Sequence, residues 1–257
     1  QLGDGTTTDR SQPVKVSDIF SVVAVSAGAR HTCAVDISNQ LHCWGANESG
    51  QLGDASTTQR TTPVEISGEF AGATAGDTHT CGFDGDGVAR CWGANGQAQL
   101  GLQNTTDQTS PADVTGGFEF SLMALGDEHT CGLTAGAAPA CWGDNSEGQV
   151  GDGSTSNRNT PILIGINDSL SGISAGEDHT CAQAAGGFVY CWGDNRLGQL
   201  GDGTSNDANE PQELPTSVSM TALSAGDAHT CAIDDQGKMW CWGDGDKGQL
   251  GSGRSVE

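Results

Sequence analysis

The stretch SAGEDHTCAQAAGGFVYCWGDNRLGQLGDGT, residues 174–204, is one of five similar copies that follow one another along the 257-residue chain. In every copy a His-Thr-Cys tripeptide is followed, ten residues after its Cys, by Cys-Trp-Gly. The pairs use all ten cysteines: Cys33/Cys43, Cys81/Cys91, Cys131/Cys141, Cys181/Cys191 and Cys231/Cys241. A repeat of about 50 residues that fills the chain predicts a solenoid, a propeller or an array.

Each repeat contains the sequence signals of four short strands. A Gln-Leu/Val-Gly turn leads to a proline, and a short strand follows that proline. The second strand is built of small residues and ends in Gly, as at Ala175-Gly176, while His-Thr-Cys opens the third and Cys-Trp-Gly ends the fourth. Four short antiparallel strands repeated around an axis describe a β-propeller. The second strand is expected to be innermost, because strands that crowd a central axis need small side chains.

We therefore predict an all-β fold, a single propeller domain over residues 1–257 with five four-stranded blades. The repeat units fall at approximately 1–48, 49–96, 97–146, 147–196 and 197–246, with a short duplicated tail at 247–257. The post-proline strand at 14–17 is expected to complete the blade at about 220–243, which would close the ring and remove its free edges. Gly248-Gln249-Leu250-Gly251 duplicates the turn at Gln1-Leu2-Gly3, however, which favours the alternative of a five-repeat part of a larger, seven-bladed propeller or an open array.

The cysteine spacing predicts five disulfides. Two residues ten apart lie opposite each other in a hairpin whose turn is midway, with Cα atoms roughly 4.5 Å apart, a separation that a disulfide tolerates. Each bridge should stabilise its hairpin by about 2–3 kcal/mol. The Cys-x-x-Cys spacing of zinc sites is absent. Five disulfides indicate an oxidising location, extracellular or at the cell surface.

The charge of the chain limits its partners. There are 33 acidic residues against 10 basic ones, a formal net charge of −23, which repels phosphate backbones and argues against nucleic-acid binding. No apolar run of 18 residues exists, so no membrane insertion is expected. The acidity serves solubility, or alternatively a cation or a basic partner.

The tryptophans that follow the second cysteines are expected to point away from the disulfides, because neighbours in a strand face opposite ways. We predict that they pack between blades, with an aromatic sugar-binding platform as the alternative; they are Trp44, Trp92, Trp142, Trp192 and Trp242. Trp240 is an extra tryptophan and, with Met239, a candidate surface contact.

The histidines of the His-Thr-Cys motifs and their neighbouring acids form a candidate ring at the channel mouth, which could hold a cation or an anionic ligand. The ring would contain His31, His79, His129, His179, His229, Asp77, Asp127, Asp178 and Asp227. The alternative is a structural hydrogen bond of the turn, repeated in every blade.

No cofactor and no metal are expected, apart from calcium as a possibility. The segments 84–87 and 244–246 resemble calcium loops but lack the later ligands. No nucleophile elbow and no phosphate-binding glycine loop are present in the sequence, so an enzyme is the less favoured class.

The motif Ser-Ala-Gly-x-x-His-Thr-Cys-Ala, followed by Cys-Trp-Gly-x-Asn-x-x-Gly-Gln-Leu-Gly-Asp-Gly-Thr, resembles the repeats of the regulator of chromosome condensation (alpha-tubulin suppressor-like) family, in particular its bacterial, cysteine-bearing branch. The resemblance covers essentially the whole chain and implies a propeller, usually seven-bladed, so five repeats are a departure. The family's chromatin binding and guanine-nucleotide exchange are not expected here, because the charge and the disulfides are wrong for a nuclear protein.

Three functions follow as hypotheses. The first is a secreted or cell-surface, non-catalytic scaffold that binds a protein or glycan partner. The second is a structural repeat array within a larger extracellular protein. The third is an enzyme or a metal site at the channel mouth.

Overall fold

The computed structural model describes residues 1–253, which form strands and connecting loops. Within this range nineteen strands make five antiparallel sheets, so the predicted all-β propeller fold is confirmed. Blade 1 contains β1 (Val22–Ala27), β2 (His31–Asp36), β3 (Gln40–Gly45) and β4 (Arg60–Glu69); blade 2 contains β5 (Gly72–Ala75), β6 (His79–Phe83), β7 (Ala89–Gly93) and β8 (Gln108–Asp113); blade 3 contains β9 (Phe120–Leu125), β10 (His129–Thr134), β11 (Pro139–Gly143) and β12 (Arg158–Leu163); blade 4 contains β13 (Leu170–Ala175), β14 (His179–Ala184), β15 (Val189–Gly193) and β16 (Ala208–Glu213); blade 5 contains β17 (Met220–Ala225), β18 (His229–Asp234) and β19 (Met239–Gly243).

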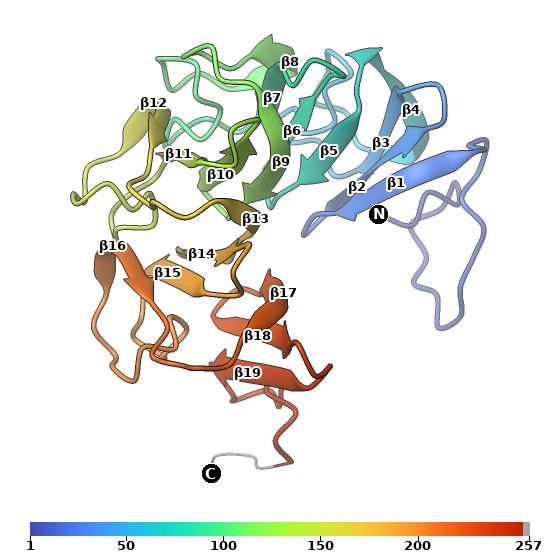
Figure 1. Ribbon diagram of the computed structural model, residues 1–257. Helices are drawn as coiled ribbons and strands as arrows, with labels where there is room; N and C mark the ends of the chain where they lie inside the picture. The colour runs from blue at the N-terminus through green and yellow to red at the C-terminus, as the bar shows by residue number, and fades with distance from the viewer. Residues whose placement is uncertain (254–257) are drawn as a thin grey trace.

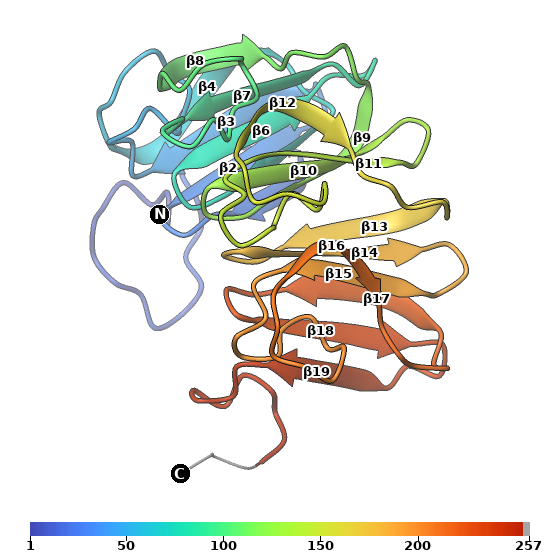
Figure 2. The same ribbon diagram turned by 90° about the vertical axis from the view of Figure 1, so that its left-hand side faces the viewer.

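The blades lie side by side in an arc (Figures 1 and 2). The small-residue strands β1, β5, β9, β13 and β17 contact one another in succession along its inner side. The predicted position of the second strand is therefore confirmed.

The structural blades are offset by one strand from the sequence repeats. The outermost strand of each of the first four blades comes from the following repeat. In blade 3, Cys141 pairs across the sheet with Ile162 of β12, although Cys141 ends the repeat unit at 97–146 and Ile162 belongs to the unit at 147–196. Each of these blades is thus tied to the next repeat by main-chain hydrogen bonds.

All five predicted disulfides are present. They join Cys33 to Cys43, Cys81 to Cys91, Cys131 to Cys141, Cys181 to Cys191 and Cys231 to Cys241. In each blade the two cysteines are directly opposed in the central hairpin, as Cys131 of β10 and Cys141 of β11 are. The Cα atoms of the five pairs lie 4.1–4.2 Å apart, somewhat closer than the expected 4.5 Å, and no cysteine among the described residues is free.

The expected closure of the ring is wrong. The sheet of blade 5 has three strands, and residues 14–17 form no strand. Figure 1 shows β1 and β19 at opposite ends of an open arc, with the segment before β1 extending beyond blade 1. The curvature between five blades of this geometry does not bring the two ends together within residues 1–253, so the alternative of a five-repeat part of a larger propeller or an open array describes the structure.

Trp92, Trp142, Trp192 and Trp242 pack between blades, as predicted, whereas Trp44 of blade 1 has no preceding blade within residues 1–253 and donates to the Gln1 carbonyl. Trp92 of blade 2 is buried in the apolar cluster of blade 1, where its ring meets Phe70 edge-on with centroids 5.6 Å apart. Gly53 of the preceding loop has a φ of +81°, and a Cβ there would lie 2.6 Å from the indole Nε1. Gly101, Gly151 and Gly201 approach the next indole in the same way, so the Gly of these turns is required by close approach as well as by its backbone conformation.

The disulfides take part in the same packing, which the sequence analysis did not predict. Cys131 and Cys141 of blade 3 are 0% exposed and belong to one apolar cluster with Trp192 of blade 4. The disulfides of blades 1, 2 and 4 likewise share a cluster with the tryptophan of the following blade. Alternation along a strand predicts that each tryptophan points away from the disulfide of its own blade. It does not predict that the tryptophan packs against the disulfide of the preceding blade. The bridge of Cys141 is therefore part of the contact between blades as well as a link within one hairpin.

Residues 1–253 include no helix with the length and hydrophobicity that a membrane span requires.

Candidate functional site

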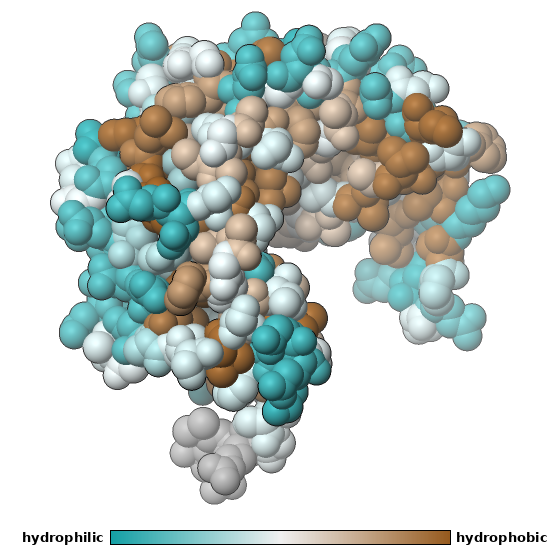
Figure 3. All heavy atoms as spheres, in the orientation of Figure 1, coloured by the Kyte–Doolittle hydropathy of each residue, from teal (hydrophilic) through white to brown (hydrophobic). Residues whose placement is uncertain are grey.

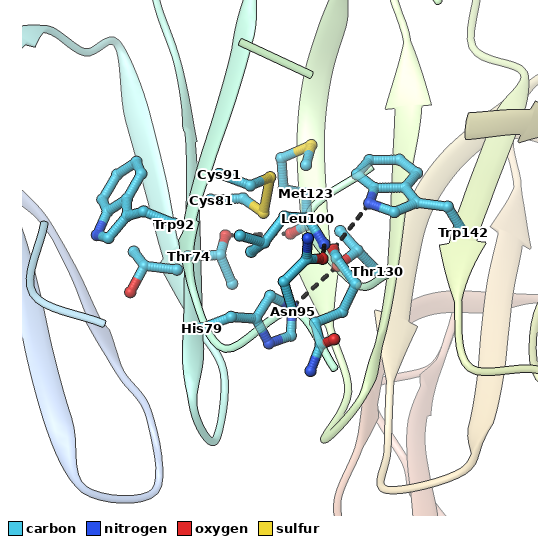
Figure 4. Close-up of a disulfide and its surroundings, with 12 residues drawn as sticks. Thr74, His79, Cys81, Cys91, Trp92, Asn95, Leu100, Met123, Thr130 and Trp142 are labelled. Carbon is cyan, nitrogen blue, oxygen red and sulfur yellow. Dashed lines mark hydrogen bonds between the residues drawn. A yellow bond between two sulfur atoms is a disulfide. The ribbon is translucent and has the colours of Figure 1, made fainter. Parts of the chain in front are cut away.

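The junction between successive blades contains a network of four polar groups. At the junction of blades 2 and 3, Thr130 Oγ1 and Trp142 Nε1 both donate to the main-chain carbonyl of Gln99, each over 2.8 Å. His79 Nε2 lies 2.9 Å from Thr130 Oγ1 (Figure 4). The imidazole of one blade is therefore linked to the threonine and the tryptophan of the next blade.

The same network recurs at all four junctions of the arc. Its members, in the order His, Thr, Gln and Trp, are His31, Thr80, Gln51 and Trp92; His79, Thr130, Gln99 and Trp142; His129, Thr180, Gln149 and Trp192; and His179, Thr230, Gln199 and Trp242.

The loop that presents the Gln carbonyl is organised by a buried asparagine. Asn95 Oδ1 accepts the Leu100 amide over 3.0 Å, and its Nδ2 donates to the carbonyls of Asn104 and Thr106. Asn47, Asn145 and Asn195 make equivalent bonds in other repeats. The fifth repeat has Gly245 at this position.

The hydrogen bonds fix the tautomer of the four junction histidines. The single hydroxyl proton of each threonine is donated to the Gln carbonyl, so the hydroxyl oxygen must accept from Nε2–H of the imidazole. Nδ1 then carries a lone pair, and in His31, His79, His129 and His179 it is buried without a hydrogen-bond partner. Burial lowers the pKa of His31 and His129 to about 4 and that of His79 and His179 to about 3. These imidazoles are therefore neutral.

The expected ring of imidazoles at the channel mouth is not formed. Four of these histidines are fully buried and point into the junctions: His31, His79, His129 and His179. Each makes a structural hydrogen bond to a threonine of the next blade, which was the alternative interpretation. His229 is partly buried at the end of the arc, on the side of blade 5 where no further blade lies in residues 1–253. Sequence spacing placed the histidines at the start of a strand, but it does not determine whether the imidazole points toward the hollow or toward the next blade.

Acidic side chains do meet at the mouth of a central hollow. The hollow, of about 190 Å³, is lined by the ends of the five inner strands and by Asp77, Asp127 and Asp227. Burial and the charges of Asp77, Glu177, Asp227 and Asp178 raise the pKa of Asp127 to about 6. The hollow is therefore a site of uncompensated negative charge, and no Lys or Arg lines it in the described structure.

Asp178 does not line this hollow. Its Oδ1 accepts from Gln149 Nε2 over 3.1 Å, and burial together with the charges of Glu177, Asp144, Asp194 and Glu147 raises its pKa to about 6. The repeat position of Asp77, Asp127 and Asp227, two residues before the histidine, is held in the fourth repeat by Glu177. Neither Glu177 nor Asp178 is among the residues that line the hollow, but the charges of both act on Asp127.

In the segments 84–87 and 244–246, which resemble calcium loops in sequence, Asp84 and Asp244 bind groups of the protein itself. Asp84 Oδ1 accepts the amides of Asp86 and Val88, and Oδ2 lies 3.4 Å from Arg90. Asp244 accepts the Asp246 amide and Gln249 Nε2. Both segments are thus turns capped by an Asp side chain.

A separate acidic group is formed by Glu147, Asp194 and Asp207, whose carboxylate oxygens lie within 4.8 Å of one another. Arg196 pairs with Glu147 over 2.5 Å and with Asp194 over 3.1 Å. The chain therefore supplies a counter-ion to this group.

Trp240 is exposed in part, at 45% of its surface, and its indole donates to Asp234 Oδ2 over 3.0 Å. Met239 beside it is 70% exposed. The structure thus places the candidate surface contact on blade 5, at one end of the arc.

The fold and the junctions define a propeller-type repeat protein. The chain belongs to the RCC1-like domain family, whose profile matches residues 1–257. No curated protein sequence matches it significantly.

Solved structures of this fold are similar at low sequence identity. Human WBSCR16 superposes with a TM-score of 0.80 at 21% identity, over 92% of this chain and 65% of that protein. Yeast RCC1 (Prp20), in a crystal structure with Kap60, gives 0.74 at 21% identity, over 86% of this chain and 56% of that protein. The ectodomain of the Arabidopsis thaliana receptor kinase ACR4 gives 0.56 at 24% identity, over 87% and 69%. The chain thus spans less than two thirds of the length of the first two proteins, and the likeness establishes the fold.

Replacing Thr130 by Val tests the junction network. The substitution keeps the side-chain shape but leaves His79 Nε2–H buried without an acceptor, so the free energy of unfolding should fall by about 1–3 kcal/mol in chemical denaturation. The matched control is Thr32→Val: Thr32 holds the same repeat position in blade 1, but its hydroxyl bonds only to the Gln1 carbonyl, over 3.2 Å. Equal losses in the two variants would contradict a role for the histidine bond.

Replacing Asp127 by Asn tests the charge at the hollow. Because the folded pKa of Asp127 is raised to about 6, this carboxyl favours the fold below its unfolded pKa near 3.9 and opposes it increasingly as the pH rises through 6. Asp127→Asn should therefore stabilise the protein at pH 8, by about 1 kcal/mol after solvent screening, and lose this advantage at pH 3.5. Thermal unfolding at both pH values measures the difference, with Asp86→Asn as the control for net charge. A gain that is the same at both pH values would show that repulsion is not its cause.

Proposed function

We propose that this RCC1-like domain is a non-catalytic scaffold, secreted or displayed at the cell surface, that binds a basic segment of a partner protein at the mouth of its central hollow. The observation that carries the proposal is the convergence of Asp77, Asp127 and Asp227 on the hollow. Burial raises the pKa of Asp127 to about 6, and the negative charges of Asp77 and Asp227 add to this shift. A Lys or Arg side chain from a partner would relieve the repulsion among these charges, so binding and charge compensation would coincide.

Relatives of the same fold have protein partners. Yeast RCC1 (Prp20) was crystallised with Kap60, and the crystal structure of Prp20p was described together with its binding properties to Gsp1p and histones. These partners belong to those proteins. They support a protein-binding scaffold as the class of function for this chain, without identifying its partner.

The location is supported by the disulfides and by two neighbours. Five bridges that use every cysteine of the chain would be expected to persist only in an oxidising compartment. The receptor kinase ectodomains of Physcomitrella patens CR4, with a TM-score of 0.56 at 23% identity, and of Arabidopsis thaliana ACR4 have the same fold.

Two other functions lose their main support. The enzyme hypothesis needed imidazoles at the channel mouth, but four of the five lie in the junctions and are neutral. The sugar-platform hypothesis needed exposed indoles, but Trp92, Trp142 and Trp192 are fully buried.

Binding of a decalysine peptide, measured by calorimetry at two salt concentrations, tests the proposed site. The variant Asp77→Asn/Asp127→Asn/Asp227→Asn should bind it at least about tenfold more weakly than the parent protein, since two or three charge pairs are lost. The control Glu65→Gln/Glu210→Gln/Glu213→Gln removes three exposed carboxylates of the outer strands and the same net charge. If the two variants lose affinity equally, binding of the peptide depends only on the overall charge of −23 and the proposed site is wrong.

A further inference from the structure

A polar groove lies between the hairpin turns of blades 1 and 2. It has a volume of about 510 Å³ and is lined by Asn39, by residues 67–70, by residues 84–86 and by Arg90. The strand β2 runs from the hollow, which residues 27–29 line, to the turn that contains Asn39. The groove and the hollow are therefore at opposite ends of the strands, and the volume of the groove is typical of a small-molecule site.

The groove exists because the connection from blade 1 to blade 2 is two residues shorter than its counterparts. The residues that bound this connection are, in successive blades, Ile66 and Phe70, Val114 and Phe120, Ile164 and Leu170, and Leu214 and Met220. Three residues, 67–69, separate the first pair, whereas five separate each of the others. The longer connections supply Phe118, Ile166 or Val218, which pack on an apolar cluster. The short connection is Ser-Gly-Glu, and it has no apolar side chain to fill this space.

The short connection also leaves a backbone donor without its usual acceptor. In blade 3 the Ala135 amide donates to the Glu119 carbonyl over 2.8 Å, and the amides of Ala185 and Asp235 make the equivalent bond in blades 4 and 5. The corresponding amide in blade 2 is that of Gly85, which has no backbone acceptor within residues 1–253. Gly85 is exposed and lines the groove, so its N–H can bind a ligand there.

Arg90 places a fixed guanidinium at the groove. Its Nε donates to Asp113 over 3.0 Å, and its Nη2 lies 3.4 Å from Asp84 Oδ2. The guanidinium carbon also lies 5.8 Å from the centre of the Phe70 ring. The other oxygen of Asp84 accepts two amides of its own turn. A donor and an acceptor are thus held side by side, so little side-chain freedom is lost when both bind a ligand.

The charges around the groove favour a neutral ligand. The carboxylates of Glu69, Asp84 and Asp86 line it and repel an anion. Arg90 already compensates Asp84 and repels a cation at the centre of the groove.

The mixture of donors and acceptors favours hydroxyl groups. One hydroxyl can donate to a carboxylate and accept from a guanidinium or an amide N–H, and hydrogen bonds to charged groups are the stronger ones. Asn39 and Ser67, both exposed, add an amide and a hydroxyl to the lining. Figure 3 shows hydrophilic residues along much of the outer rim of the arc, a surface that suits a polar ligand whose remainder stays in water.

We propose that this groove binds a neutral saccharide, such as the terminal hexose of a glycan. Arg90 and the Gly85 amide donate to its hydroxyl oxygens, and Asp84 accepts from its hydroxyl groups. The site goes beyond the protein-binding function proposed above, since it is separate from the hollow. It also requires no exposed tryptophan.

Mapping of amide shifts by proton–nitrogen NMR on the intact chain tests the proposal. The probes are the methyl glycosides of glucose, galactose, mannose and N-acetylglucosamine at millimolar concentration, because a single hexose offers few contacts. At least one of them should shift the amides of Gly68 and Gly85. Glucosamine and glucuronate, which carry a positive and a negative charge, should bind at least about tenfold more weakly than that glycoside, since each meets a like charge in the groove.

A blocked variant and a matched control locate the site. A Cβ at Gly85 would meet no heavy atom within 4 Å, so Gly85→Phe should fill the groove without straining the fold and abolish the shift of Gly68. Ala135→Phe makes the same change at the equivalent exposed position of blade 3 and should leave binding unchanged. Thermal unfolding of both variants verifies that they are folded.

Three results would overturn the proposal. The first is the absence of shifts at Gly68 and Gly85 with all four neutral glycosides, which decides the matter on the parent chain even if Gly85→Phe does not fold. The second is a response to glucosamine or glucuronate alone, which would identify a charged ligand. The third is a shift of Gly68 that persists in folded Gly85→Phe, which would mean that the sugar binds elsewhere.

Discussion

One main-chain carbonyl at each junction, that of the glutamine in the Gln-Leu/Val-Gly turn, is the contact on which the stacking of the blades depends. Both of its lone pairs are used, one by the threonine hydroxyl and one by the tryptophan indole of the next blade. The histidine of the preceding blade then bonds to the same threonine. Because the carbonyl, the hydroxyl and the indole are all buried, the loss of any one leaves another polar group unsatisfied.

The disulfides and the polar networks have different tasks. Each disulfide closes one hairpin and so holds the His-Thr strand in register with the Trp-Gly strand, as in β6 and β7. The contact between blades depends on this register, because Thr80 and Trp92 lie directly opposite each other and both donate to the Gln51 carbonyl. A slip of one strand by one residue would turn its side chain to the other face and so separate Thr80 from Trp92. The bridge makes no hydrogen bond to the carbonyl, but it adds apolar contact at the junction, where Cys141 shares a cluster with Trp192 of the next blade.

The same organisation explains which features the sequence could predict. Strand order, the disulfides and the burial of Trp92 and Trp142 follow from local spacing and from alternation along a strand, so they were predictable. The packing of the Cys131–Cys141 bridge with the next blade was not, because it depends on how two blades stack. The burial of His79 was not predictable either, because a residue at the start of a strand can turn toward the hollow or toward the neighbouring blade.

Closure of the ring depends on the rotation between successive blades, which no short segment encodes. At the candidate site, Asp77, Asp127 and Asp227 could be found from their repeat position, two residues before the histidine, whereas Asp178, one residue before its histidine, does not line the hollow.

The state of the junction histidines tests this account most directly. Long-range proton–nitrogen correlation spectra of the imidazole rings distinguish the two neutral tautomers and the imidazolium. The account predicts that His31, His79, His129 and His179 carry their proton on Nε2 at pH 7 and stay neutral at pH 5.5, since burial lowers their pKa values to between about 3 and about 4. Protonation on Nδ1, or titration of these rings near the ordinary histidine pKa of about 6.5, would show that the histidine–threonine–carbonyl network does not hold the blades together.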